Sequence, residues 1–148
     1  TKSIYKVLES NGTSTNNVLV VASDGTNTFE FTADSASIYI IECWLNLTTS
    51  GSSGVILNIS TTGTTTSSFS ITGSSNSASA LRYEVLQYNA SSATFASFTS
   101  AGTAYAYMQG SLITPGTGGV VRIRYRDNNA GQTVYAVAGS WMRVKKIK

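Results

Sequence analysis

Residues 37–47 read SIYIIECWLNL, and the alternation of side chains along this run decides the fold class. A period of two is typical of a β-strand that is buried on one face. The face expected to pack in the core consists of Tyr39, Ile41, Cys43, Leu45 and Leu47. The opposite face still carries Ile38, Ile40 and Trp44. We therefore expect a loop, an N-terminal segment or a neighbouring subunit to cover part of that second face.

Similar runs recur along the whole chain, separated by turn-forming stretches such as SNGTSTNN (10–17) and TPGTGG (114–119). No window shows the i, i+3, i+4, i+7 apolar spacing of an amphipathic helix. The sequence therefore predicts an all-β fold, an antiparallel β-sandwich of 8–10 strands.

Composition favours one folded domain with few charges. The chain has 148 residues, of which 11% are charged and 43 are serine or threonine. Its net charge of +3 is uneven, because residues 1–120 carry −3 and residues 121–148 carry +6. The single Cys43 excludes an internal disulfide, and without histidine the usual Cys/His zinc site is excluded too. The sequence shows neither an N-terminal signal peptide nor an apolar run long enough to span a membrane.

The last residues, GSWMRVKKIK (139–148), read either as a free basic arm or as a strand of the sheet. Met142 and Val144 fall on one face of this run. Apolar side chains on one face are typical of a strand packed in a sheet and not of a free basic arm. We therefore predict a strand that completes a sheet. We expect Lys145, Lys146 and Lys148 to solubilise the end of this strand, where the chain leaves the sheet.

The run GVVRIRYRD (119–127) alternates in the same way. Its apolar residues Val121, Ile123 and Tyr125 are expected to face the core. The other face carries a stripe of three cations: Arg122, Arg124 and Arg126. The stripe is a candidate contact for a partner or a polyanion. The alternatives are a solvated face with pairing to cross-strand carboxylates such as Glu84, or contact with an acidic protein shell.

In AYAYMQGSL (104–112) the core face is expected to hold small or flexible side chains: Ala104, Ala106, Met108 and Leu112. Tyr105 and Tyr107 stand on the outer face. Two large aromatic side chains there suit a contact between subunits, but isolated exposed tyrosines are also common on β-sheets. The pattern alone leaves both readings open.

Catalytic chemistry has little support in the sequence. The absence of histidine removes the commonest general base. Asp24, Asp34 and Asp127 lie in turn-like sequences, where aspartate caps backbone amides. Glu42 with Glu84 is the acid/base pair to consider, of the kind that glycosidases use. We predict that the chain is not an enzyme and that it uses no cofactor and no metal.

The C-terminal part of the chain resembles a known group of domains. Residues 104–147, AYAYMQGSLITPGTGGVVRIRYRDNNAGQTVYAVAGSWMRVKKI, are similar to the last strands of jelly-roll domains in bacteriophage surface and tail-fibre proteins. The features that carry the resemblance are GSL (110–112), the glycine-rich turn, the NN.G hairpin (128–131) and AGSWMRVKKI (138–147). FEFTADSASIYIIECWL (29–45) resembles the entry into the long second strand of that fold.

These phage domains are themselves similar to the trimeric heads of the tumour necrosis factor and complement globular-head superfamily. The resemblance implies a jelly-roll homotrimer with residues 18–148 as one domain and residues 1–17 as an N-terminal strand or arm, which is a candidate anchor. It also implies a trimer interface that includes Tyr105, Tyr107 and Trp141. The family offers no catalytic residues to carry over.

The functional expectation is a structural protein of the virion surface, made in the host cytoplasm without a signal peptide and in contact with other virion proteins. A capsid decoration role is expected for a chain without a stalk. The alternative is a tail-fibre tip or a receptor-binding knob that holds a host glycan with loops 48–54, 60–66 and 73–79 near Trp44 or Tyr88. Nucleic-acid binding is the third reading, and a membrane role is not expected.

Overall fold

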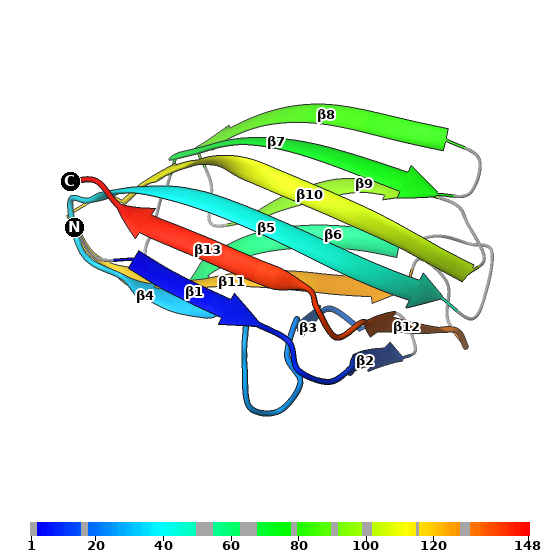
Figure 1. Cartoon of the computed structure of the whole chain (residues 1–148). Helices are drawn as coiled ribbons and strands as arrows, with labels where there is room; N and C mark the ends of the chain where they lie inside the picture. Colours follow the sequence, from blue (N-terminus) through cyan, green and yellow to red (C-terminus); the bar gives the residue numbers. More distant parts are fainter. Residues whose placement is uncertain are drawn as a thin grey trace.

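The computed structural model describes residues 3–15, 18–49, 55–62, 68–77, 80–89, 92–98, 102–114, 116–127 and 131–148. Of residues 15, 62, 68–77, 80–89, 92–98 and 102–104 it describes the backbone alone. The described chain forms thirteen β-strands in two antiparallel sheets. The two sheets lie face to face in Figure 1.

The larger sheet has a central path of six strands in the order β1-β13-β5-β10-β7-β8, with β12 paired to β5 and β2 paired to β12. Its strands are β1 (Ser3–Val7), β2 (Gly12–Thr15), β5 (Ile38–Thr49), β7 (Ser68–Ser77), β8 (Ala80–Asn89), β10 (Gly102–Ile113), β12 (Thr133–Ala136) and β13 (Trp141–Lys146). The smaller sheet runs β3-β11-β6-β9, with β4 also paired to β11. Its strands are β3 (Val20–Val21), β4 (Glu30–Ala33), β6 (Val55–Thr62), β9 (Ser92–Phe98) and β11 (Gly119–Asp127).

The strand order is that of a jelly roll. The four strands β1-β13-β5-β10 face the four strands β4-β11-β6-β9, and the chain changes sheet at each connection from β4 to β6 and from β9 to β11. The hairpin β7–β8 is added beside β10 and extends the larger sheet. The all-β sandwich prediction is confirmed, but 8–10 strands was too low a number. One of the additional strands is β2, whose residues GTST were assigned to a turn.

The core lies between the sheets, where the alternation along β5 places it. Tyr39, Ile41, Cys43, Leu45 and Leu47 are at most 3% exposed. In β10 the inward set is also confirmed for Ala106, Met108 and Leu112, whereas the side chain of Ala104 is outside the described part. Complete burial of a large apolar side chain stabilises the fold by about 1.5–3 kcal/mol. Burial also raises the pKa of the Cys43 thiol far above its ordinary value, which keeps it protonated.

The C-terminal run is a strand of the sheet, as predicted. β13 lies between β1 and β5, and Met142 and Val144 are buried beneath it. The start of β1 lies beside the end of β13, since Ser3 pairs with Lys145 (Figure 1). Lys146 does more than solubilise the end of β13, since its Nζ lies 2.9 Å from Asp34 Oδ2 in an ion pair.

Both strands of the predicted N-terminal arm are built into the larger sheet. β1 pairs with β13 and β2 pairs with β12. The Nζ of Lys6 donates to the main-chain oxygens of Thr28 at 2.8 Å and Glu30 at 2.6 Å, and so links β1 to β4 of the other sheet. Leu8, directly after β1, is 1% exposed.

Asp24 caps a turn, as its sequence context predicted. Its carboxylate accepts hydrogen bonds from the backbone amides of Glu9 at 2.7 Å, Thr26 at 2.9 Å and Asn27 at 2.6 Å. These amides, led by that of Asn27, hold the pKa of Asp24 well below its ordinary value. Asp127 differs from the prediction: it is the last residue of β11 and is fully buried, with Thr49 Oγ1 at 3.5 Å from its Oδ2.

Tyr125 is the largest fully buried side chain of the described core. Its neighbours in the predicted inward set, Val121 and Ile123, are also buried. The Tyr125 hydroxyl makes no hydrogen bond of ordinary geometry within the described residues, and the nearby main-chain amide of Ala136 only partly offsets the effect of burial on its pKa. Burial raises the pKa of Tyr125 to about 12.

Candidate interaction faces

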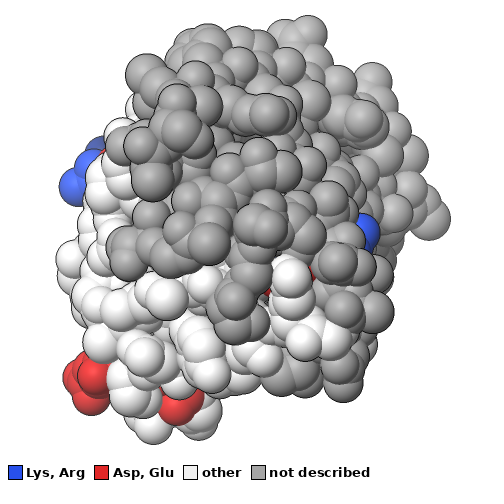
Figure 2. All heavy atoms as spheres, turned by 90° about the vertical axis from the view of Figure 1, so that its right-hand side faces the viewer, with Lys and Arg blue, Asp and Glu red and all other residues white. Residues whose placement is uncertain are grey.

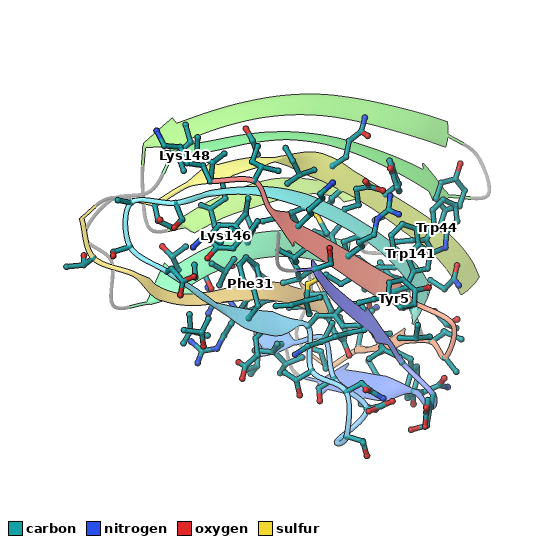
Figure 3. The ribbon with its side chains drawn as sticks, turned by 60° about the vertical axis from the view of Figure 1, so that its left-hand side comes forward. Tyr5, Phe31, Trp44, Trp141, Lys146 and Lys148 are labelled. Carbon is teal, nitrogen blue, oxygen red and sulfur yellow. The ribbon has the colours of Figure 1, made fainter. Side chains whose placement is uncertain are left out.

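Five aromatic side chains gather on the outer face of the larger sheet, away from the core. We call them the aromatic face: Tyr5, Trp44, Tyr105, Tyr107 and Trp141. They come from β1, β5, β10 and β13, which the register holds side by side. Figure 3 shows Tyr5, Trp44 and Trp141 together at one end of the sheet, with Lys146 and Lys148 toward the other end.

The rings contact one another across the strands. Trp44 stacks on Tyr105 with ring centroids 4.6 Å apart and planes at 10°. Tyr107 contacts both tryptophans, with its ring centroid 6.2 Å from that of Trp44 and 6.4 Å from that of Trp141. Tyr5 completes the series at 6.3 Å from Trp141 and is 64% exposed. Such pairs contribute about 0.5–1.5 kcal/mol each beyond their buried area, so the cluster is preorganised.

A polar centre lies beside the rings. Arg143 Nη2 donates to both oxygens of Glu42, at 2.8 and 2.9 Å. The Tyr107 hydroxyl lies 3.4 Å from Gln109 Oε1, and burial together with the negative charge of Glu42 raises the pKa of Tyr107. Hydrogen bonding to Glu42 raises the pKa of Arg143. Arg143 therefore stays charged and Tyr107 stays neutral in the physiological pH range.

A second apolar group lies at the far end of the same outer face. Ile40 is 37% exposed, Ile113 is 48% exposed and Ile147 is 53% exposed. Ile38 pairs with Ile113 in the register, and its backbone is hydrogen-bonded to Ile147. The outer face of the larger sheet thus has apolar groups at both ends and an ion pair between them.

The structure brings together the three residues that the sequence singled out for a trimer contact, Tyr105, Tyr107 and Trp141. It adds Trp44, which the alternation had already placed outward, and Tyr5, which the sequence analysis missed. Tyr5 could not be found from its local pattern, because its place depends on the pairing of β1 with β13.

The arginine stripe lies on the outer face of the smaller sheet, along β11. Arg122 Nε forms an ion pair with Glu30 Oε2 at 3.0 Å. The suggested partner Glu84 is wrong for this stripe, since β8 belongs to the larger sheet. Within the described residues, Arg124 and Arg126 bind neutral groups. Arg124 Nε lies 2.9 Å from Asn58 Oδ1, and Arg126 Nη1 lies 3.1 Å from the main-chain oxygen of Asp127.

The strand order separates the two strands whose glutamates were considered for acid/base chemistry. β10 and β7 lie between β5, which carries Glu42, and β8, which carries Glu84. Three interstrand steps amount to about 14 Å, beyond the separation of a glycosidase pair. Among the described side chains, no three potential metal ligands of the His, Cys, Asp or Glu type gather at one place. Within the same residues, no helix is both long and apolar enough to cross a bilayer.

Figure 2 shows the end of the molecule that lies on the right in Figure 1. Among the described residues, drawn in white, blue and red, charged side chains are sparse there. The loops predicted to hold a glycan, 48–54, 60–66 and 73–79, and the side chain of Tyr88 lie largely outside the described side chains.

No protein-family model matches the chain, and no curated protein matches it. Among solved structures, murine APRIL of the tumour necrosis factor family is similar at 9% identity and a TM-score of 0.44, over 96% of this chain and 95% of that chain. The structure of black queen cell virus is similar at 8% identity and a TM-score of 0.38, over 93% of this chain and 71% of that chain. CBM35 from Cellvibrio japonicus Abf62 is similar at 12% identity and a TM-score of 0.35, over 95% and 96% of the two chains. Likenesses this distant say nothing of function, and the jelly-roll assignment rests on the strand order.

Proposed function

We propose that the chain is a non-enzymatic structural protein of a bacteriophage virion, a capsid decoration protein that assembles as a homotrimer through the aromatic face. On this proposal it is made in the host cytoplasm and ends on the virion surface beside other virion proteins. The aromatic face is the observation that carries the proposal.

The rings of the aromatic face lie on the solvent side of the larger sheet, away from the core between the sheets. Here five rings from four strands pack on one another, and Tyr5 at the end of the series is 64% exposed. Exposed apolar groups rimmed by polar ones mark protein–protein contacts in soluble proteins, and Tyr and Trp are enriched there. The isoleucines at the other end of the face and the Arg143–Glu42 pair between the two groups fit a contact that spans the whole sheet.

The resemblance of residues 104–147 to phage jelly-roll domains supports two parts of the proposal, the trimeric state and the place on a virion. The jelly-roll order of the described strands agrees with that resemblance. Two strands, β10 and β7, lie between the strand of Glu42 and the strand of Glu84, which supports a non-enzymatic function.

The test is the native mass of the purified chain at low micromolar concentration. A homotrimer has three times the chain mass of 15.6 kDa. Tyr105→Ser with Tyr107→Ser removes the two rings of β10 that contact Trp44 and should dissociate the trimer to monomers. Tyr5→Ser is the milder variant, because it removes only the exposed end of the series, and it should weaken the trimer without unfolding the chain.

Val18→Ser is the matched control, since it removes an apolar side chain that is 55% exposed and lies outside the aromatic face. It should leave the mass unchanged. A wild-type monomer, or a trimer that survives both tyrosine variants while folded by circular dichroism, contradicts the proposed contact.

A receptor-binding knob is the second candidate, because the aromatic face also carries amides that suit sugar hydroxyls. Trp44 Nε1 donates to Asn46 Oδ1 at 2.9 Å, and Gln109 is exposed next to Tyr107. A glycan array separates the two functions. A monomer with saturable glycan binding that Trp44→Ala abolishes would favour the knob.

A further inference from the structure

The outer face of the smaller sheet holds two arginines that form no ion pair with any described residue. Among the described residues the ion pairs join Arg122 to Glu30, Arg143 to Glu42 and Lys146 to Asp34. Arg124 and Arg126 take part in none of them and bind only an amide and a main-chain oxygen. A cation that is partly withdrawn from water gains from an anionic partner.

Arg124 is held in place as well as left without a counter-ion. Its partner Asn58 is 1% exposed although it lies on the outer face, opposite Arg124 in the register. The hydrogen bond from Nε therefore fixes the guanidinium over a buried amide and leaves its Nη groups as donors. Burial first, and then the positive charge of Arg122, lower the pKa of Arg124. A fixed guanidinium loses little conformational entropy when it binds a ligand.

Apolar neighbours flank the two cations. Val21 pairs with Arg124 and Ile56 pairs with Arg126, so all four side chains share the outer face. Both apolar residues are partly exposed. Arginine beside apolar side chains is typical of protein–protein interfaces.

Spacing and composition favour carboxylates over phosphates. Alternate residues of a strand lie about 6.6 Å apart, so an extended segment with acidic residues at every second position matches the two arginines. Two cations are fewer than the about six to ten phosphate contacts of a typical nucleic-acid site. The described residues that share this face with the arginines include no aromatic ring on which a base would stack.

We propose that Arg124 and Arg126 form a docking site for an acidic protein segment in extended conformation, whose carboxylates at alternate positions each bind one guanidinium. Val21 and Ile56 contact the apolar side chains beside those carboxylates. The site lies on the opposite side of the sandwich from the aromatic face, so its use does not depend on the trimer.

The probe is a fluorescein-labelled peptide of alternating glutamate and threonine, titrated with wild-type protein and followed by anisotropy at low and at 0.15 M salt. Arg124→Gln with Arg126→Gln should weaken binding at least tenfold. Arg126→Gln alone should weaken peptide binding about threefold. This single variant removes only a hydrogen bond to a main-chain oxygen, so it replaces the double variant if that one does not fold. Lys145→Gln with Lys148→Gln removes the same amount of charge from exposed lysines elsewhere and should change binding less than twofold.

An equal loss in the lysine control would overturn the site, because binding would then follow net charge alone. The proposal also fails if wild type does not bind the peptide at low salt. A third outcome is that oligothymidylate of equal charge binds as tightly as the peptide and loses affinity in the arginine variants. The ligand of the site would then be a nucleic acid and not an acidic protein segment.

Discussion

Replacing Tyr125 with Phe tests whether the buried Tyr125 hydroxyl destabilises the folded protein. The hydroxyl is fully buried in β11 and makes no hydrogen bond of ordinary geometry within the described residues. A buried hydroxyl without a partner costs about 1–3 kcal/mol. We therefore expect Tyr125→Phe to raise the free energy of unfolding at pH 7 by about 1 kcal/mol, after the lost contacts of the oxygen atom are allowed for. For a domain of this size that corresponds to about 3 °C in Tm.

The difference should grow at alkaline pH. In the unfolded chain tyrosine loses its proton near its ordinary pKa of 10.0, whereas burial holds the pKa of Tyr125 in the folded chain at about 12. Between these values the unfolded state binds fewer protons than the folded state, so the stability of the wild type falls as the pH rises. The loss is about 1.4 kcal/mol per pH unit, and it is absent in Tyr125→Phe.

Urea unfolding at fixed protein concentration, followed by tryptophan fluorescence at pH 7, 9, 10 and 11, measures both effects. Tyr135→Phe is the control, because it removes a hydroxyl from a ring that is 37% exposed. A Tyr125→Phe protein that is less stable than wild type at pH 7 would show that the hydroxyl has a stabilising partner. A difference that stays constant from pH 9 to pH 11 would refute the pKa assignment.

Two further predictions concern the turns and close approaches of the chain. Gly12→Ala should lower the free energy of unfolding by about 1–3 kcal/mol, because the added Cβ would lie 2.1 Å from the main-chain oxygen of Ser23. Gly116→Ala is the control, because its added Cβ would meet nothing within 4 Å, and it should leave the stability unchanged. Thermal melts of the two variants measure the difference. Asp24→Ala should destabilise the protein above pH 4 and flatten its acid unfolding curve, because a group whose folded pKa is lowered contributes stability that is lost as the pH falls. If wild type and Asp24→Ala show parallel stability curves from pH 2 to pH 7, the turn does not depend on the carboxylate.

Local alternation was enough to predict which side chains of β5, β11 and β13 are buried. A shift by one residue would have turned Arg122, Arg124 and Arg126 inward, so the register could be inferred without knowing the partner strands. The strand β2 was missed for the converse reason. Its sequence GTST has no apolar residue, and it is a strand only because β12 provides its hydrogen bonds.

The composition of the aromatic face and the pairing of the arginines depend on contacts between distant parts of the chain. Glu30 meets Arg122 because β4 pairs with β11, and Tyr5 meets Trp141 because β1 pairs with β13. Neither pairing leaves a trace in the local pattern of hydrophobic residues. The sequence therefore identified Tyr105, Tyr107 and the arginine stripe as candidates, but not which charges the fold neutralises.

The place of β13 between β1 and β5 has a consequence for biosynthesis. A ribosome makes β1 and β5 well before β13, so during translation the edge of β5 that will receive β13 has no partner in this sheet, and neither has β1. Long-range pairing of this kind is slow, and unpaired edges invite association between nascent chains. The larger sheet can close only after β13 has left the exit tunnel, so its assembly waits for the last of its strands to be made.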